Sequence, residues 1–402
     1  MSGTRKRIPE LDGLRVLMIF IVSWYHIWQQ SWLRPVIGNT SLDFLVRSGY
    51  IWVDGTVLMS SFLLFLPYAK TMRSGAPAPD TRDFYFRRVQ RIVPAFYFIT
   101  LAVLLGIALP WQLYGSPQYL VKDLATHLTF TFTFFPDTYL STPLGAASWT
   151  LAIEVQAYAL FPLIARGAMK KPVLTLGLMC ALCFGFRAWC IWALSDYSMV
   201  VNQLINFLDV YALGIVAAMG FVRLQERAGQ EGDGSPQAKK KRLAVRAAAT
   251  LLFAGIFFAL IRLLRLQAST PDYTQIQEKQ MIFRPVFALC FCGLMLTAPF
   301  SLAPLRKLLG NPVTRFLGGV SMNYYLIHQT VTVHLKRIGF PPSESDTPNL
   351  AGEQPWQTQY TLLCFGISLA LAVLVTYAIE KPAARWLGKL RGKKHPASGG
   401  PA

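Results

Sequence analysis

Long apolar stretches recur along this chain of 402 residues, of which 53% are hydrophobic and only 15% are charged. One helical crossing of a membrane needs about 20 predominantly apolar residues, because the hydrocarbon core of a bilayer is about 30 Å thick. The sequence therefore predicts an all-α polytopic membrane protein with about ten transmembrane helices. We place these helices at residues 11–29, 50–69, 92–109, 148–165, 172–194, 200–222, 243–264, 281–300, 313–333 and 360–379.

The net charge of +19 is distributed unevenly among the segments between these helices. If the N-terminus is cytoplasmic, the inner segments hold 28 of the 39 lysines and arginines, and the outer segments hold 9. Basic residues favour the cytoplasmic side of a membrane, so this bias predicts that both termini are cytoplasmic. Topology thereby explains most of the positive charge, and the sequence predicts no nucleic-acid partner.

The six cysteines all fall within predicted helices, and Cys180 and Cys183 have the C-x-x-C spacing of a redox or zinc pair. No second pair and no histidine lies nearby, which favours small apolar core residues. The five histidines show no H-x-x-x-H spacing. The sequence therefore predicts neither a disulfide framework nor a metal site.

Four ionisable residues lie toward the outer ends of predicted helices: His26, Asp54, Glu154 and His328. At a rise of 1.5 Å per residue, His26 lies about 25 Å along its helix and His328 about 22 Å along its own. Isolated charges are costly at that depth, so we expect the four side chains to face one another across a polar cavity.

His26 has the chemistry of a general base. A histidine oriented by Glu154 or Asp54 could take the proton of a sugar hydroxyl as that hydroxyl attacks a thioester carbonyl. Other interpretations stay open at this point. His26 could be a hydrogen-bonded packing residue, Asp54 could be solvated near the interface, and the tyrosines beside His328 could form an aromatic belt.

A basic group stands at the predicted cytoplasmic mouth of the third helix, within the sequence FYFRRVQRIVP at residues 84–94. Arg88 and Arg91 are three residues apart, so they share a helix face and could clamp phosphates together. Arg15, near the start of the first helix, would line the same mouth. Coenzyme A carries phosphates at one end and a thioester at the other, so it suits a basic inner mouth combined with an outer acid-base layer.

Six short motifs, in order along the chain, resemble those of acyltransferase family 3. The opening motif is Leu11-Asp12-Gly13-Leu14-Arg15 followed by His26. The others are Trp52-Val53-Asp54 with Ser60-Ser61-Phe62, the segment 86–94 with Arg88 and Arg91, the segment 148–154 with Tyr158 and Pro162, the segment 317–328 ending in His328, and Glu380-Lys381-Pro382. The sequence departs from the family pattern at Trp52 and Ser61.

The resemblance implies an enzyme that moves an acyl group, commonly acetyl, from cytoplasmic acyl-CoA to a hydroxyl of an extracytoplasmic or lipid-linked carbohydrate. It carries the catalytic role onto His26 and donor binding onto Arg88 and Arg91, with Arg15, Asp54 and Glu154 as supporting residues. Within the same motifs we assign Trp149, Tyr325 and His328 to substrate binding. The resemblance implies a multi-pass protein of the bacterial inner membrane, in contact with membrane lipid.

We expect residues 1–390 to form one transmembrane acyltransferase domain and residues 391–402 to form a basic, disordered tail. We expect residues 119–135 to form an interfacial or re-entrant segment on the outer side. We expect residues 225–241 to form a flexible linker. Some relatives carry a fused extracytoplasmic esterase-like domain that receives the acyl group. This chain ends without one, so we expect either direct acylation of the acceptor or a separate extracytoplasmic acceptor protein.

Two other functions are compatible with ionisable residues inside a membrane. A secondary transporter or exporter of a glycan or small molecule also uses such residues, although no matching halves are visible in the sequence. A non-catalytic membrane subunit of an envelope complex is the third interpretation. Binding of acyl-CoA would distinguish a transferase from a transporter and from a non-catalytic subunit.

Overall fold

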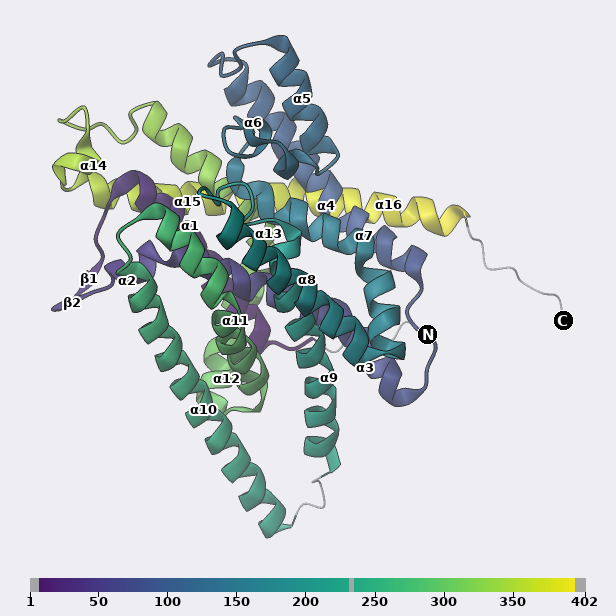
Figure 1. The fold of residues 1–402 in the computed structure, drawn as a ribbon. Coiled ribbons are helices and arrows are strands. Elements are labelled where there is room, and N and C mark those ends of the chain that lie inside the picture. The colour runs from purple at the N-terminus through teal and green to yellow at the C-terminus, as the bar shows by residue number, and fades with distance from the viewer. Residues whose placement is uncertain (1–6, 231–234, 395–402) are drawn as a thin grey trace. The chain divides into compact units, whose positions relative to one another are not determined.

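A computed structural model describes residues 7–230 and 235–394, and these residues are almost entirely helical (Figure 1). Within these residues the strands are β1 (Val36–Ile37) and β2 (Thr40–Ser41), which pair antiparallel as a short hairpin. Nine helical segments in the described ranges are long and apolar enough to cross a membrane: 10–31, 49–74, 81–108, 149–170, 172–193, 204–228, 236–268, 273–300 and 356–391. The predicted all-α polytopic class is therefore confirmed.

The tenth predicted span differs from the other nine. Residues 313–333 fall within α13 (Pro312–Arg337), a helix of 26 residues that is not among the nine apolar segments. Asn323, His328 and Thr332 are fully buried on this helix. The helix is long enough to cross a membrane, but its polar groups are enclosed by protein.

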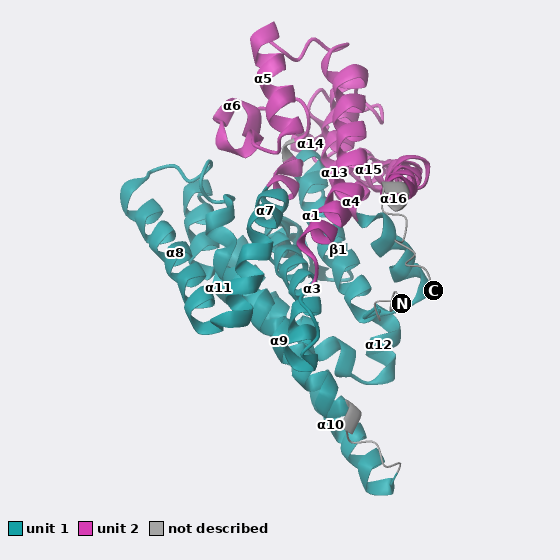
Figure 2. Ribbon diagram, turned by 90° about the vertical axis from the view of Figure 1, so that its right-hand side faces the viewer, with its two compact units in different colours: residues 1–78, 153–321 teal, residues 79–152, 322–402 magenta. Residues whose placement is uncertain are grey.

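The chain divides into two compact units, coloured in Figure 2. Unit 1 comprises residues 1–78 and 153–321, and unit 2 comprises residues 79–152 and 322–402. One boundary lies between residues 78 and 79, and the other two fall inside α7 (Trp149–Lys170) and α13.

Unit 1 contains most of the long helices. Apart from α7 and the start of α13, its elements are α1 (Glu10–Ser31), α2 (Asp43–Arg47), η1 (Gly49–Ile51), α3 (Trp52–Ser74), α8 (Pro172–Ala193), η5 (Leu204–Phe207), α9 (Leu208–Gln230), α10 (Pro236–Ala268), α11 (Tyr273–Thr297), η6 (Ala298–Phe300) and α12 (Ala303–Leu309).

Two glycines allow close helix approach in unit 1. A Cβ atom on Gly13 of α1 would lie 2.3 Å from the backbone oxygen of Leu309 in α12. A Cβ atom on Gly214 of α9 would lie 2.8 Å from the backbone oxygen of Leu58 in α3. Both positions therefore need glycine for packing.

Unit 2 combines short and long helices. Its elements are α4 (Thr81–Val103), η2 (Leu104–Ala108), α5 (Pro117–Leu128), η3 (Phe132–Phe134), α6 (Pro136–Tyr139), η4 (Ala146–Ser148), α14 (Pro348–Ala351), α15 (Trp356–Val375), η7 (Thr376–Glu380) and α16 (Lys381–Lys394), with the later part of α13. The segment 119–135 lies in α5, η3 and their flanking turns and is not one of the nine candidate spans.

Local sequence explains several helix boundaries. Asp80, Ser116 and Asp272 accept hydrogen bonds from backbone N–H groups three residues ahead, and so begin α4, α5 and α11. Ser235 does the same for α10, and Pro236 follows it at the first helical position.

The predicted linker at 225–241 is wrong over most of its length. Helix α9 continues to Gln230 and α10 begins at Pro236, so residues 231–235 separate the two helices, and of these 231–234 lie outside the described residues. The polar composition of the segment hid the capping signal at Ser235 and Pro236. At the C-terminus α16 extends to Lys394, and residues 395–402 of the predicted tail lie outside the described residues.

Candidate active site

His26 is half-buried on α1, and its ring is oriented by a residue of the same helix. Its Nδ1 lies 3.0 Å from Oε1 of Gln29, and Nε2 of Gln29 donates to the hydroxyl of Tyr25 at 2.9 Å. An amide oxygen can only accept, so in this arrangement Nδ1 carries the proton and Nε2 carries the lone pair of the neutral ring. In the neutral imidazole held this way, Nε2 is the basic nitrogen.

Asp54 is fully buried on α3, opposite Arg284 of α11. Its Oδ1 lies 3.2 Å from Nε of Arg284, whose guanidinium also stacks 4.0 Å from the ring centroid of Phe207. Among the described residues, neither Asp54 nor Glu154 forms a hydrogen bond or ion pair with His26. The structure thus gives Asp54 an arginine partner and gives His26 an amide partner.

A second buried ion pair lies close to the first. Arg187 of α8 donates to both carboxylate oxygens of Asp209 on α9, at 2.7 and 2.8 Å. Arg187 also donates from Nε to Oδ1 of Asn206 at 2.9 Å, and Arg284 donates to the backbone oxygen of the same asparagine at 3.1 Å. Asn206 therefore joins the two pairs into a cluster of four charges, which we call the buried ion cluster.

Sequence reasoning missed this cluster. It assigned no role to Arg187, Asp209 or Arg284. Two arginines within apolar stretches were the available signal, because hydrocarbon excludes unpaired charges. The cluster also changes the interpretation of one cysteine, since Sγ of Cys183 donates to Oδ1 of Asp209 at 3.3 Å. All six cysteines are free thiols.

Glu154 is half-buried on α7 and accepts a hydrogen bond from the hydroxyl of Tyr158 at 2.8 Å. The same hydroxyl lies 3.5 Å from Oγ of Ser60 on α3. Ser61, where the sequence departs from the family pattern, donates to the backbone oxygen of Tyr211 at 2.6 Å. The glutamate is thus placed beside hydroxyl groups in unit 1.

Arg15 is half-buried on α1, in a region where neighbouring carboxylates are already paired. Asp12 pairs with Arg7 at 2.7 Å, and Glu10 pairs with Arg306 of α12 at 2.8 Å. Together with the close approach at Gly13, these pairs fix the start of α1 within unit 1.

The predicted arginine group lies on α4 in unit 2. Arg87 pairs with Asp83 at 3.4 Å, and Arg391 of α16 pairs with the same carboxylate. Arg88 is half-buried, with its guanidinium 5.5 Å from the ring centroid of Phe84, and Arg91 is exposed. Arg87 is exposed as well, so two of the three arginines are accessible to a polyanion.

Two predicted motifs meet in unit 2. Nδ2 of Asn323 on α13 donates to Oγ1 of Thr376 and to Oε2 of Glu380, both at 2.7 Å. Thr376 and Glu380 are the first and last residues of η7, a single π-helical turn, and such turns are frequent at functional sites. The late motif and the Glu380-Lys381-Pro382 motif are therefore one hydrogen-bonded structure.

The three predicted substrate-binding residues all belong to unit 2. His328 is fully buried, and its Nδ1 lies 2.7 Å from the backbone oxygen of Tyr325. Its ring is parallel to that of Tyr324, with centroids 6.1 Å apart. Trp149 is half-buried at the start of α7.

The predicted site residues are thus divided between the two units. His26, Asp54, Glu154 and Arg15 lie in unit 1, whereas Arg88, Arg91, Trp149, Tyr325 and His328 lie in unit 2. Within the described ranges, no three residues among histidine, cysteine, aspartate and glutamate are grouped so as to hold a metal ion.

Apolar helices that enclose ionisable side chains define a polytopic membrane protein with polar sites inside its spans. The family model described as an acyltransferase domain matches residues 8–380, so the chain belongs to acyltransferase family 3. The resemblance read from the six motifs is therefore confirmed.

Two relatives illustrate what the chain is similar to. It is 27% identical to the peptidoglycan O-acetyltransferase OatA of Listeria monocytogenes over 203 residues, which cover 46% of this chain and 29% of that protein. It is 29% identical to the O-acetyltransferase OatA of Staphylococcus aureus over 168 residues, which cover 39% of this chain and 24% of that protein. The chain thus matches less than a third of the length of these relatives. No solved structure matches it.

Proposed function

We propose that the protein is an O-acyltransferase of the bacterial inner membrane, surrounded by membrane lipid. It moves an acyl group, commonly acetyl, from cytoplasmic acyl-CoA to a hydroxyl of an extracytoplasmic or lipid-linked carbohydrate. The family match over residues 8–380 carries this proposal. The name of the Listeria relative favours a cell-wall glycan as the acceptor, either directly or through a separate extracytoplasmic acceptor protein.

His26 is the base in this proposal. Its Nε2 takes the proton of the acceptor hydroxyl as the hydroxyl oxygen attacks the acyl carbonyl carbon. The C–S bond of the thioester breaks, the electron pair leaves with sulfur, and the imidazolium returns the proton to the thiolate. The hydrogen bond between Nδ1 and Gln29 supports this role, because it leaves the lone pair on Nε2.

Asp54 and Glu154 are positioning residues in the proposal. Asp54 acts through its pair with Arg284, and Glu154 acts through its hydrogen bond with Tyr158. One or the other was expected to orient His26, and in this proposal Gln29 orients the ring through its hydrogen bond with Nδ1.

Arg88 and Arg91, with Arg15, bind the phosphates of the acyl-CoA donor in the proposal. Their spacing places Arg88 and Arg91 on one helix face, and the guanidinium fork suits phosphate oxygens. Trp149, Tyr325 and His328 bind the carbohydrate acceptor.

The first experiment is titration of purified, detergent-solubilised protein with acetyl-CoA, followed by measurement of CoA release. We expect saturable binding that the double variant Arg88→Ala/Arg91→Ala weakens by at least tenfold, since two charge-assisted hydrogen bonds are lost at about 1.5–3 kcal/mol each. Arg87→Ala is the matched control, because Arg87 lies on the same helix and is already paired with Asp83. Its binding should equal that of the wild type.

Two outcomes would overturn the proposal. If the folded wild type binds no acyl-CoA, transport of a glycan or small molecule becomes the leading function. If His26→Ala leaves acyl transfer unchanged at equal protein amounts, His26 is not the base.

A further inference from the structure

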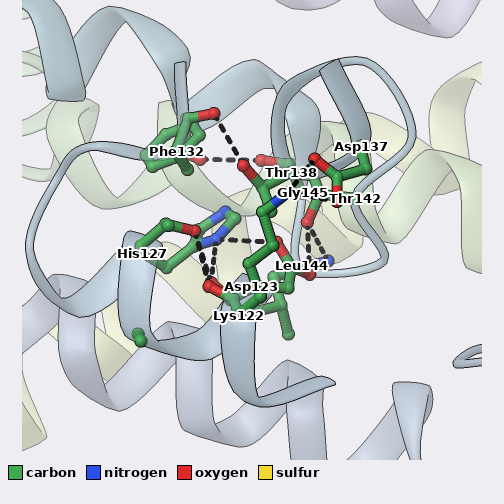
Figure 3. Close-up of polar contacts among 12 residues, drawn as sticks. Lys122, Asp123, His127, Phe132, Asp137, Thr138, Thr142, Leu144 and Gly145 are labelled. Carbon is green, nitrogen blue, oxygen red and sulfur yellow. Dashed lines mark hydrogen bonds and ion pairs between the residues drawn. The ribbon is translucent and has the colours of Figure 1, made fainter. Parts of the chain in front are cut away.

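Asp123 and His127 form a fully buried pair one helical turn apart on α5, outside the nine candidate spans (Figure 3). Nδ1 of His127 lies 3.1 Å from Oδ1 of Asp123 and 2.9 Å from the backbone oxygen of the same residue. Sequence analysis assigned no role to either residue.

The carboxylate of Asp123 is anchored by groups from two further segments. The hydroxyls of Tyr114 and Thr142 donate to its Oδ2 at 2.8 and 2.9 Å. Burial and the negative charge of Asp123 raise the pKa of Tyr114, so this phenol remains a hydrogen donor at neutral pH. The neighbouring cation, Lys122, pairs instead with Asp137 at 2.6 Å. The carboxylate is therefore held by neutral donors and by the imidazole.

The ring of His127 is fixed in its plane as well as at Nδ1. It stacks on Phe132 with ring centroids 4.1 Å apart and an interplanar angle of 4°. Stacking and the hydrogen bonds together leave the imidazole one orientation.

This geometry determines where the lone pair lies. Nδ1 faces two oxygens that can only accept, so Nδ1 carries the proton and Nε2 of the neutral ring is an acceptor. Among the described residues, this buried Nε2 has no hydrogen-bond partner. A purely structural histidine is expected to have both nitrogens satisfied, because an unpaired buried polar atom is costly.

The adjacent carboxylate makes Nε2 a stronger acceptor. The carboxylate accepts the hydrogen bond from Nδ1 and so holds the ring with Nε2 as the acceptor, as in catalytic Asp–His pairs. The group that would pair with Nε2 must therefore donate a hydrogen bond, and a hydroxyl group is the simplest such donor.

The surroundings suggest which class of molecule supplies that hydroxyl. Phe134 and Phe135, beside Phe132 in sequence, expose 54% and 40% of their surface. Hydroxyls of Thr129 and Thr131 lie 2.8 Å apart in the same segment. Exposed aromatic rings combined with hydroxyl groups suit the C–H faces and hydroxyls of a sugar.

We propose that Nε2 of His127 accepts a hydrogen bond from a hydroxyl of the carbohydrate acceptor, with Asp123 as the positioning residue of this subsite. The inference rests on the proposed function and names a binding group for its acceptor.

The test compares wild type, His127→Gln and His334→Gln for binding of a peptidoglycan tetrasaccharide by calorimetry, each with and without acetyl-CoA. We expect His127→Gln to weaken tetrasaccharide binding at least tenfold while acetyl-CoA binding stays unchanged. His334→Gln is the matched control, since His334 is another unit 2 histidine outside the predicted site and only partly buried.

A milder variant keeps the test informative if His127→Gln unfolds. Tyr114→Phe removes one hydrogen bond to Asp123 and retains the ring, so we expect a smaller loss of tetrasaccharide affinity in a folded protein. Equal tetrasaccharide affinity in wild type and both variants would overturn the inference, and so would a wild type that does not bind the tetrasaccharide. Failure of acetyl-CoA binding would instead overturn the proposed function, so the two failures are distinguishable.

Discussion

His26 in unit 1 and His127 in unit 2 present the same tautomer through different partners. The Nδ1 atom of His26 faces a neutral amide, whereas that of His127 faces a carboxylate. In unit 1 the buried carboxylates of Asp54 and Asp209 pair with arginines. In unit 2 the buried carboxylate of Asp123 is held by the imidazole of His127 and by the hydroxyls of Tyr114 and Thr142. The difference shows two ways of stabilising a buried carboxylate in one chain, by an arginine or by neutral donors together with a histidine.

The largest expected effect comes from breaking the buried ion cluster. Arg187→Met leaves Asp209 buried without its arginine, so we expect the free energy of unfolding to fall by about 3–5 kcal/mol. Thermal unfolding in detergent measures this change. Arg73→Met is the control, because the pair of Arg73 and Glu226 is largely exposed and its loss should change little. Equal destabilisation by both variants would contradict the distinction.

A smaller effect on the free energy of unfolding is expected at the buried carboxylate of Asp123 in unit 2. Asp123→Asn keeps the shape of the side chain but removes charge-assisted hydrogen bonds, so we expect a loss of about 1.5–3 kcal/mol in the free energy of unfolding. The same unfolding assay applies. The variant should be less harmful than Arg187→Met, because it leaves no unpaired buried charge. A larger loss than that of Arg187→Met would show that the carboxylate of unit 2 matters more for stability than the cluster.

The amide beside His26 should affect turnover more than stability. Gln29→Ala removes one hydrogen bond that orients the ring, so we expect acyl transfer to slow about tenfold, which corresponds to about 1.4 kcal/mol. Binding of acetyl-CoA should stay unchanged in the same preparation. Gln30→Ala, one residue further on the same helix, serves as the control. An unchanged rate in Gln29→Ala would mean that Gln29 does not orient the base.

The smallest effect is expected at an exposed pair of unit 2. The hydrogen bond from Lys122 lowers the pKa of Asp137, so the pair stabilises the folded state above the ordinary aspartate pKa, and this contribution is lost as pH falls through the lowered value. Lys122→Met should therefore lower the melting temperature slightly at pH 7 and not at all at pH 2. High salt should also remove the difference at pH 7. A difference that persists in high salt would mean that the pair is shielded from solvent.

The helices were predictable from sequence, and many of their side-chain partners were not. Apolar length alone identified nine spans, because hydrocarbon thickness sets the length of a crossing helix. The partnership of Arg187 with Asp209 depends on how α8 packs against α9, which no local pattern encodes. The division into two units inside α7 and α13 likewise depends on long-range packing.

The pair in α5 is the exception, because its spacing was visible. Asp123 and His127 are four residues apart, which places them on one helix face. The sequence did not show that the two residues are buried. Their burial depends on Tyr114 and Thr142, which reach the carboxylate from separate loops. The opposite holds for Asp54. The sequence identified this residue as a candidate but did not indicate that Arg284 is its partner.

The contact at Gly13 has a consequence for where the reaction takes place. Because residue 13 has no side chain, α1 packs directly against the backbone of Leu309. This contact fixes how far α1 is shifted along its axis relative to α12. His26 lies 13 residues further on, or about 20 Å along the helix. The contact at Gly13 therefore helps to determine the position of the His26 imidazole along the axis of α1. Any side chain at position 13 would displace α1, and with it the base of the proposed reaction, without contacting His26.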